Sequence, residues 1–309
     1  MAITAAMVKE LREMTGAGMM DCKKALNETN GNMDEAVEFL RKNGQAKAEK
    51  KASRIAAEGL CMVVTKDDQT AAVVEVNSET DFVAKNATFQ EFVKAVATQA
   101  VNSDAADMDA FMAEKWNEDA SKTVSEALVE KVAVIGENLK IRRFEKVVAE
   151  HGCVVPYVHG GGRIGVIVDA DTDVVNDTVK EAMHNIAMQI AALNPKYVSR
   201  DEVSADYIAH EKEILLAQIM NDPKESQKPE KVINGMIEGR ISKELKEVCL
   251  VDQVYVKAED GKQTVAKYLE EVSKAVGGTV KVKRFVRFET GEGLEKKQED
   301  FAAEVAAQM

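Results

Sequence analysis

Two glycine-rich patterns in the middle of the chain are of a kind that binds anions. Gly160 to Gly165 reads G-x-G-x-x-G, and His159 to Gly162 matches a glycine-rich oxyanion element. A dinucleotide site needs a helix after the glycines so that its N-terminus meets the pyrophosphate, but Ile164 to Val168 predicts a strand. An esterase needs a G-x-S-x-G nucleophile, and the sequence contains none. We therefore expect neither a nucleotide site nor acyl transfer here.

Histidine and cysteine residues are few and widely separated. His151 and Cys153 could hold a metal only with further ligands, and no second pair lies nearby at ligand spacing. The four histidines form no acid/base constellation, and the four cysteines form no C-x-x-C pair. The sequence therefore predicts no enzyme activity, no cofactor and no metal site.

A polar loop that contains an aromatic residue remains as a candidate for binding. Residues 79–86 read Glu-Thr-Asp-Phe-Val-Ala-Lys-Asn between a predicted strand and a predicted helix. In one interpretation Thr80 or Asp81 caps the helix and Phe82 packs onto the next turn as a staple. In the other, Phe82 is exposed and inserts into a partner. Local spacing alone favours the first interpretation.

Composition limits the class of protein that these residues belong to. The 309 residues are 45% apolar, 30% charged and 5% aromatic, which suits several domains of helices and short valine-rich strands, an α+β fold. The formal charge of −12 argues against nucleic acid as the main partner. One basic stretch, residues 41–54, is better explained by a solvated linker helix than by contact with RNA.

The cellular location follows from two expected absences. No secretory leader precedes Ala2, and no apolar run approaches the roughly 18 residues that a membrane span needs. We expect a cytoplasmic protein without a membrane anchor.

The first 44 residues predict three short helices that form a small bundle. Breaks are expected at Thr15-Gly16-Ala17-Gly18, at Asn30-Gly31-Asn32 and at Asn43-Gly44, where glycine or asparagine can end a helix. A bundle of this size suits binding better than catalysis.

The rest of the chain contains one unit twice. A β-hairpin, a helix and a later strand at Lys140 to Phe144 return as a second hairpin, a second helix and a strand at Lys281 to Phe285, 141 positions on. Thr172 to Val175 repeats Thr80 to Val83 at an offset of 92. By this alignment the second copy has Val174 in place of Phe82, so the aromatic residue is an addition that the fold does not require.

An insertion of two amphipathic helices interrupts the second copy at residues 195–248. Pro223 and Pro229 bracket a polar turn, so the helices should fold back into an antiparallel hairpin. Its apolar stripe could pack on its own domain or mediate self-association, and both interpretations stay open.

Five motifs in order give the chain a resemblance to the elongation factor Ts family. Residues 15–26 resemble the N-terminal signature of that family, residues 79–84 its second signature, and His159-Gly160 with residues 163–166 its third. Residues 238–240 and the pair of segments 291–293 and 301–305 are similar to its late motifs.

The resemblance implies an architecture. It consists of an N-terminal ubiquitin-associated-like three-helix domain, two related α+β subdomains with small antiparallel sheets, an antiparallel coiled-coil hairpin and a C-terminal helical module. The expected divisions are residues 1–45, a basic linker helix at 46–58, 59–150 for the first subdomain, 151–194 with 249–289 for the second, 195–248 for the hairpin and 290–309 for the C-terminal module.

The resemblance also implies a function without chemistry of its own. Such a protein binds elongation factor Tu, both GDP-bound and nucleotide-free, and promotes GDP release by disturbing its magnesium and phosphate site. It contacts no nucleic acid directly, and a dimer of the complex is left open. The residues implied at the contacts are Thr80, Asp81, Phe82, Val83, Lys23, Met19, Met20, Ile135, Gly136, His159, Met236, Ile237 and Phe301.

Overall fold

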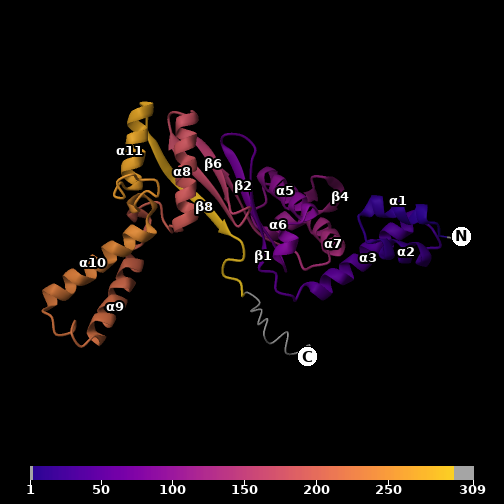
Figure 1. Cartoon of the computed structure of the whole chain (residues 1–309), viewed down its shortest axis with the longest axis horizontal. Coiled ribbons are helices and arrows are strands. Elements are labelled where there is room, and N and C mark those ends of the chain that lie inside the picture. Colours follow the sequence, from indigo (N-terminus) through magenta and orange to yellow (C-terminus); the bar gives the residue numbers. More distant parts are fainter. Residues whose placement is uncertain (1–2, 296–309) are drawn as a thin grey trace.

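The computed structural model describes residues 3–295 as an elongated molecule with three parts (Figure 1). A helical bundle lies at one end, a helical hairpin lies at the other, and two three-stranded sheets with their helices lie between them. Both sheets are antiparallel, so the predicted α+β class is confirmed.

The N-terminal bundle contains α1 (Ala5–Thr15), α2 (Met19–Glu28) and α3 (Met33–Lys51). Thr4 caps α1, and Asn32 caps α3. Leu11, Cys22 and Leu26 are fully buried at the centre of the bundle. A core this small holds the three helices together but leaves most of their surface exposed.

The helix stop expected at Asn43-Gly44 is wrong, because α3 continues to Lys51. The Asn43 side chain donates to the Phe39 carbonyl within the helix (2.9 Å). Gly44 is buried against α7, where an added Cβ would lie 3.4 Å from that of Ala133. Packing against a neighbouring helix therefore overrides the local preference of glycine for a helix end. The linker helix predicted for residues 46–58 is only partly correct, because residues 46–51 belong to α3 but residues 52–57 lie in no helix.

The first core unit is built on a three-stranded sheet. Its order is β1 (Glu58–Thr65), β2 (Thr70–Ser78) and β5 (Lys140–Val148). Helices α5 (Ala87–Asn102) and α7 (Val124–Ile135) pack beside it. The acidic segment forms α6 (Met108–Ala113), β3 (Lys115–Trp116) and β4 (Asp119–Thr123), with Phe111 and Trp116 buried in the same core.

The second core unit repeats this arrangement with the same strand order. Its sheet runs β6 (Cys153–His159), β7 (Ile164–Thr172) and β8 (Val280–Glu289). Helices α8 (Asp177–Leu193) and α11 (Val265–Val276) correspond to α5 and α7, and short 3-10 turns lie at Arg200–Glu202 and Leu250–Asp252. The β-bulge falls at Glu75/Val76 in one central strand and at Asp169/Ala170 in the other.

A pair of buried glutamines shows that the repeat extends to side-chain detail. The Gln99 amide donates to the Lys115 carbonyl and accepts from the Asn117 N–H. Gln189 makes the same two contacts with Val254 and Val256. Each glutamine satisfies the backbone of the segment that covers its helix, so both units close their cores in the same way.

The two sheets pack face to face. Apolar side chains from both sheets meet in one cluster, with Val73 and Val147 on the first sheet and Ile167 and Phe288 on the second. The opposite faces pack on α5 and on α8. Both faces of β2 are therefore covered, which explains why its residues are buried without alternation.

The inserted hairpin consists of α9 (Ala205–Asn221) and α10 (Glu230–Val248) and projects from the second unit (Figure 1). Isoleucines 219, 233, 237 and 241 pack between the two helices. The Tyr207 hydroxyl donates to the Glu244 carboxylate, and Arg240 pairs with Glu225 at 2.7 Å. The hairpin thus has an apolar seam and polar ties of its own.

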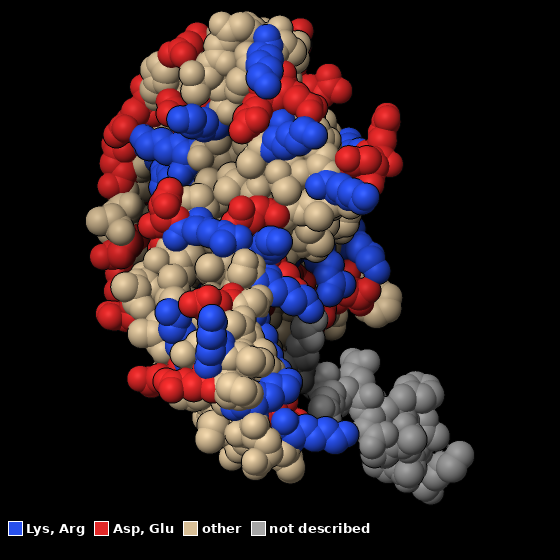
Figure 2. All heavy atoms as spheres, turned by 90° about the vertical axis from the view of Figure 1, so that its left-hand side faces the viewer, with Lys and Arg blue, Asp and Glu red and all other residues tan. Residues whose placement is uncertain are grey.

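Two further observations concern the surface. Among residues 3–295, no helix is both long enough and apolar enough to cross a bilayer. Figure 2 views the molecule from the end at which the hairpin lies. On this face, Lys and Arg side chains are interspersed with Asp and Glu.

Candidate partner-binding site

Phe82 lies on a four-residue helix, α4 (Asp81–Ala84), between β2 and α5. Its side chain is 80% exposed, so it does not pack as a staple. Thr80 caps α4 by accepting from the Val83 N–H at 3.3 Å, whereas α5 has its own cap, Asn86. The structure therefore chooses between the two interpretations of this loop: its aromatic side chain faces solvent.

The predicted alignment of Thr80 with Thr172 is wrong. The Thr172 hydroxyl donates to a carbonyl two residues on, and in the first copy Ser78 makes this contact. Residues 79–85 link Ser78 to the cap of α5, whereas only residues 173–175 link Thr172 to the cap of α8, Asn176. The first copy is longer by the four residues of α4. Phe82 is thus part of an insertion and not a substituted position, which backbone register could show and sequence similarity could not.

The charged residue beside Phe82 is tied locally. The Lys85 ammonium lies 2.6 Å from the Asp81 carboxylate, one helical turn away. The hydrogen bond from Lys85 is the main cause of the lowered pKa of Asp81. Asp81 therefore stays ionised beside the exposed aromatic ring, while half-buried Val83 turns toward the first core.

Gly136 lies at the base of the same loop. It ends α7 in the left-handed conformation (φ 88°), and its carbonyl accepts from the Lys51 ammonium at 2.5 Å. Ile135 is half-buried against the first core. The next residue, Glu137, accepts hydrogen bonds from the backbone of Glu79 and Thr80. The structure thus brings Gly136 and Thr80 together, although 56 positions separate them in sequence.

Sequence reasoning missed Glu137 and its neighbour Asn138 as part of this site. The Asn138 N–H donates to the Glu79 carboxylate at 2.6 Å. The only signal available was an acidic residue directly after a glycine helix stop, and many surface loops share that pattern.

His159 is exposed at the end of β6, and its Nδ1 lies 2.9 Å from the Tyr157 hydroxyl. The glycines that follow form the β6–β7 turn, and a strand comes next, as the sequence predicts. The Gly162 carbonyl accepts from the Cys61 N–H at 2.6 Å, so this turn lies against β1. The β6–β7 turn that follows His159 and the helix that bears Phe82 thus both contact β1.

The other predicted residues lie elsewhere. Met19 and Met20 are 58% and 74% exposed on α2, with Lys23 beside them, in the bundle at the far end of α3. Met236 is half-buried on α10, whereas Ile237 is 7% exposed and packs toward α9. Phe301 lies outside the described residues.

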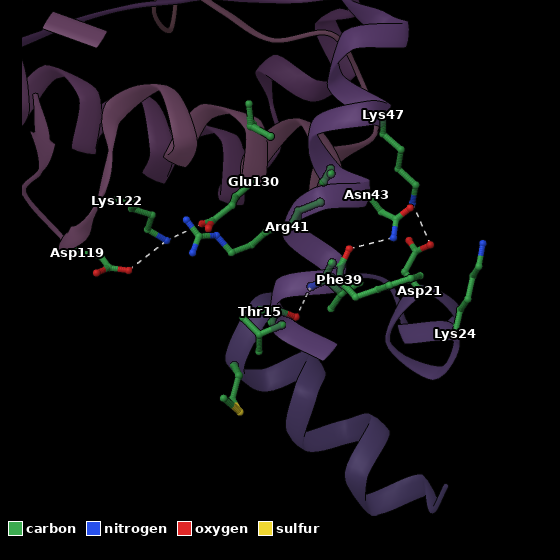
Figure 3. A pocket seen from close by; sticks show the side chains of 18 of the residues that line it. Thr15, Asp21, Lys24, Phe39, Arg41, Asn43, Lys47, Asp119, Lys122 and Glu130 are labelled. Atoms are coloured by element: carbon green, nitrogen blue, oxygen red, sulfur yellow. Dashed lines mark hydrogen bonds and ion pairs between the residues drawn. The ribbon is translucent and has the colours of Figure 1, made fainter. Parts of the chain in front are cut away.

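A cleft of about 280 Å³ separates the bundle from the first core unit (Figure 3). Val37, Leu40 and Val134 form part of its apolar lining, and charged side chains surround it. Within the bundle Lys47 pairs with Asp21 at 2.9 Å, and across the gap Arg41 pairs with Glu126 at 3.3 Å. The first pair joins α3 to α2, and the second joins α3 to α7. Among residues 3–295, no group of three or more potential metal ligands is found.

Comparisons with known proteins show which family the chain resembles. A family model described as elongation factor TS matches residues 79–292. Elongation factor Ts of Clostridioides difficile (strain 630) is 53% identical over 308 residues, or 99% of each chain. Proteins of the same name from Clostridium novyi (strain NT) and Clostridium tetani (strain Massachusetts / E88) are 51% and 49% identical over equal lengths.

The duplicated core, the helical bundle and the aromatic loop define a modular α+β protein that exposes apolar side chains on both the bundle and the core. Within that class, the chain belongs to the elongation factor Ts family. Membership places it in translation elongation during protein biosynthesis, as a guanine nucleotide exchange factor for elongation factor Tu. An exchange factor catalyses no chemical reaction.

Proposed function

We propose that the chain releases GDP from elongation factor Tu by inserting Phe82 beside the magnesium and phosphate site of that GTPase. The exposure of this side chain supports the proposal: Phe82 is 80% exposed on a helix that the second copy lacks. Burying such a ring in a partner gains about 1.5–3 kcal/mol. The internal fold gains little from the ring, so its benefit arises in the complex.

Exchange of this kind is a linkage between two binding events. The factor and GDP both bind the GTPase, and each weakens the other by the same coupling free energy. Each tenfold loss of nucleotide affinity requires about 1.4 kcal/mol of differential binding. One inserted ring with flanking contacts therefore supplies a few powers of ten. Thr80, Asp81 and Val83 provide those flanking contacts in the proposal.

Three further surfaces complete the proposed interface. Exposed Met19, Met20 and Lys23 on α2 bind the GTPase domain. Ile135, Gly136 and His159 provide the core contact, and Met236 with Ile237 lies near the hairpin contact. Because Ile237 is buried against α9, we propose that it acts indirectly, by holding α10 in place for the contact. The proposed C-terminal contact at Phe301 lies outside the described residues.

The proposed domains follow these roles. Residues 1–45 form the ubiquitin-associated-like binding domain, 46–58 the linker, 59–150 the first subdomain and 151–194 with 249–289 the second. Residues 195–248 form a coiled-coil hairpin, and the C-terminal module assigned to residues 290–309 lies, from residue 296 on, outside the described residues. Leu216, Met220 and Val232 are exposed on the hairpin and support pairing of two complexes through it.

The proposed setting is the cytoplasm, where translation elongation takes place. We propose no membrane contact, no cofactor, no bound metal and no direct contact with nucleic acid. The formal charge of −12 supports the last point, as does the interspersion of Lys and Arg with Asp and Glu in Figure 2.

The test is stopped-flow release of a fluorescent GDP analogue from elongation factor Tu. Phe82→Ala should slow factor-driven release about tenfold or more, the kinetic equivalent of about 1.4 kcal/mol. Because the side chain is exposed, its removal should change the free energy of unfolding by less than about 0.5 kcal/mol.

Val175→Ala is the matched control, since Val175 is an exposed apolar residue in the shorter turn of the second copy. It should leave release unchanged. Normal release by a folded Phe82→Ala protein would contradict the proposal. If that protein still bound the GTPase, the chain would act as an adaptor at this surface.

A further inference from the structure

We propose that Glu137 is a positioning residue that holds α4 and thereby directs Phe82 toward the GTPase. The inference rests on the proposed function of Phe82. A helix of four residues does not hold its own conformation, because too few backbone hydrogen bonds offset the loss of chain entropy. The exposed ring of Phe82 adds no packing. The direction of the ring is therefore set by the contacts that fix α4, which are the packing of Val83 and Ala84 on the first core and the hydrogen bonds at residues 79–81.

The Glu137 carboxylate makes three contacts at this point. Its Oε2 accepts from the backbone N–H of Glu79 (3.0 Å) and of Thr80 (3.1 Å), and its Oε1 accepts from the Thr80 hydroxyl (2.6 Å). Hydrogen bonds to an ionised group are about twice as strong as neutral ones. Thr80 is also the cap of α4, so the carboxylate holds the residue from which the helix begins.

A reciprocal contact locks the two loops together. Glu79 reaches back, and its Oε1 accepts from the Asn138 N–H at 2.6 Å and pairs with Arg54 at 3.5 Å. The Asn138 amide in turn donates to the Arg54 carbonyl at 2.8 Å. The start of α4 is therefore joined to the end of α7 and to the segment that follows α3.

The second copy supplies an internal comparison. Gly277 ends α11 as Gly136 ends α7, and Gly278 then occupies the position of Glu137. A Cβ at Gly278 would lie 2.8 Å from a methyl group of Val174, which belongs to the short turn. Where the four-residue helix is absent, the turn occupies this space, and a side chain at position 278 would have to displace Val174. The carboxylate and α4 therefore occur together in one copy and are both missing from the other.

The experiment measures GDP release at saturating factor for Glu137→Ala, for Phe82→Ala and for the double variant. A positioning role predicts that Glu137→Ala lowers the maximal release rate about fivefold or more. The factor concentration at half-maximal rate should change less than twofold, because the other contact surfaces remain. In the Phe82→Ala background, Glu137→Ala should have no further effect, since there is no ring left to direct.

Two variants serve as controls. Glu137→Gln keeps the side-chain shape and one acceptor oxygen, so its release rate should lie between those of the unmodified protein and Glu137→Ala. If Glu137→Ala does not fold, Glu137→Gln takes its place in the release measurement. Glu118→Ala removes an exposed carboxylate in the β3–β4 turn and should leave release unchanged.

The outcomes separate this inference from the proposed function. If Phe82→Ala slows release but Glu137→Ala does not, or if the two effects multiply in the double variant, Glu137 does not direct the ring. A loss confined to half-saturation or melting temperature would also contradict positioning. Normal release by Phe82→Ala would overturn the proposed function and this inference with it.

Discussion

At the scale of single residues, Gly162 controls how closely the β6–β7 turn approaches the first sheet. Its φ is +103°, and an added Cβ would lie 2.6 Å from Leu60 Cδ2. Its carbonyl accepts from the Cys61 N–H and, at 3.2 Å, from the Thr290 hydroxyl. One residue without a side chain thus lets three segments meet.

Gly162→Ala should lower the free energy of unfolding by about 1–3 kcal/mol, because the new methyl group strains the backbone and displaces Leu60. Gly161→Ala is the matched control: its φ is also positive (+65°), but nothing lies within 4 Å of an added Cβ. Chemical denaturation of both variants measures the difference. Equal losses would show that backbone strain alone matters and that the close approach to Leu60 does not.

At the scale of elements, the α9–α10 hairpin is stabilised mainly by contacts within itself. Its apolar cluster draws on the two helices and the residues at their base, including Val203 and Cys249. At the base of the hairpin the chain before α9 is joined to the chain after α10, because the Leu250 N–H donates to the Tyr197 carbonyl at 2.9 Å. The first copy closes the equivalent connection without such a hairpin, so the fold of the unit does not require it.

Deletion of residues 205–246, with a short Gly-Ser linker in their place, should therefore leave a cooperative thermal transition. Some loss of melting temperature is expected because Val203 and Tyr197 lose their partners. Calorimetry is the measurement. As a control, the same linker inserted between Lys224 and Glu225 keeps both helices and alters only the tip. A deletion variant that melts without a cooperative transition would show that the hairpin is part of the core.

At the scale of the whole molecule, a buried carboxylate joins the two units. Glu75 is fully buried in β2 and accepts from Arg142 at 2.9 Å and Arg143 at 2.6 Å, both on β5. It also accepts from the Gly291 N–H (2.8 Å), just past the end of β8. Burial alone would raise the pKa of Glu75, but these hydrogen bonds and charges outweigh it and lower the pKa.

Asp169 occupies the equivalent bulge in the second sheet and behaves in the opposite way. It is 1% exposed, its oxygens accept no hydrogen bond among the described residues, and Arg284 lies 3.5 Å away. Burial raises the pKa of Asp169 because Arg284 only partly offsets the loss of water. Two related positions thus have opposite effects on stability.

The pH dependence of stability follows from these directions. A carboxyl group with a lowered folded-state pKa stabilises above its ordinary value of 4.5, and this stability is lost as the pH falls through the folded pKa. Glu75→Gln should therefore cost about 3 kcal/mol at pH 7, because it leaves two arginines without their buried partner. Its deficit relative to the unmodified chain should shrink as the pH falls below about 4.5.

Asp169→Asn is the matched comparison. A raised pKa means that the ionised form destabilises the fold above that pKa, so the variant should lose little stability at pH 7 or gain some. Urea unfolding of both variants from pH 3.5 to 8 is the measurement. Equal losses at pH 7 would contradict the difference assigned to the two sites.

Much of the local structure could be predicted from the sequence. The helix breaks predicted at Thr15-Gly16-Ala17-Gly18 and at Asn30-Gly31-Asn32 depend on neighbours in the chain, and the structure has both of them. The order of two hairpins, two helices and two later strands follows from the same local signals. The motifs of residues 15–26 and 79–84 also carried the resemblance to the family.

Other features depended on contacts between distant segments, which no local pattern contains. Gly44 lies within a helix because Ala133 packs against it, and Ile237 is buried because α9 covers it. Register against β5 and β8 showed that Thr172 corresponds to Ser78 and not to Thr80. Sequence similarity had aligned Thr80 with Thr172, because the two short polar turns have similar residues although these residues occupy different positions in the fold.

The candidate site divides in the same way. The sequence by itself determined that Phe82 follows a strand, precedes a helix and has a capping threonine beside it. Only the tertiary structure decided that the ring is exposed and that Glu137, 55 positions on, holds its backbone. Caps and turns are set by dihedral preferences within a few residues, whereas exposure depends on which distant segments arrive to cover a side chain.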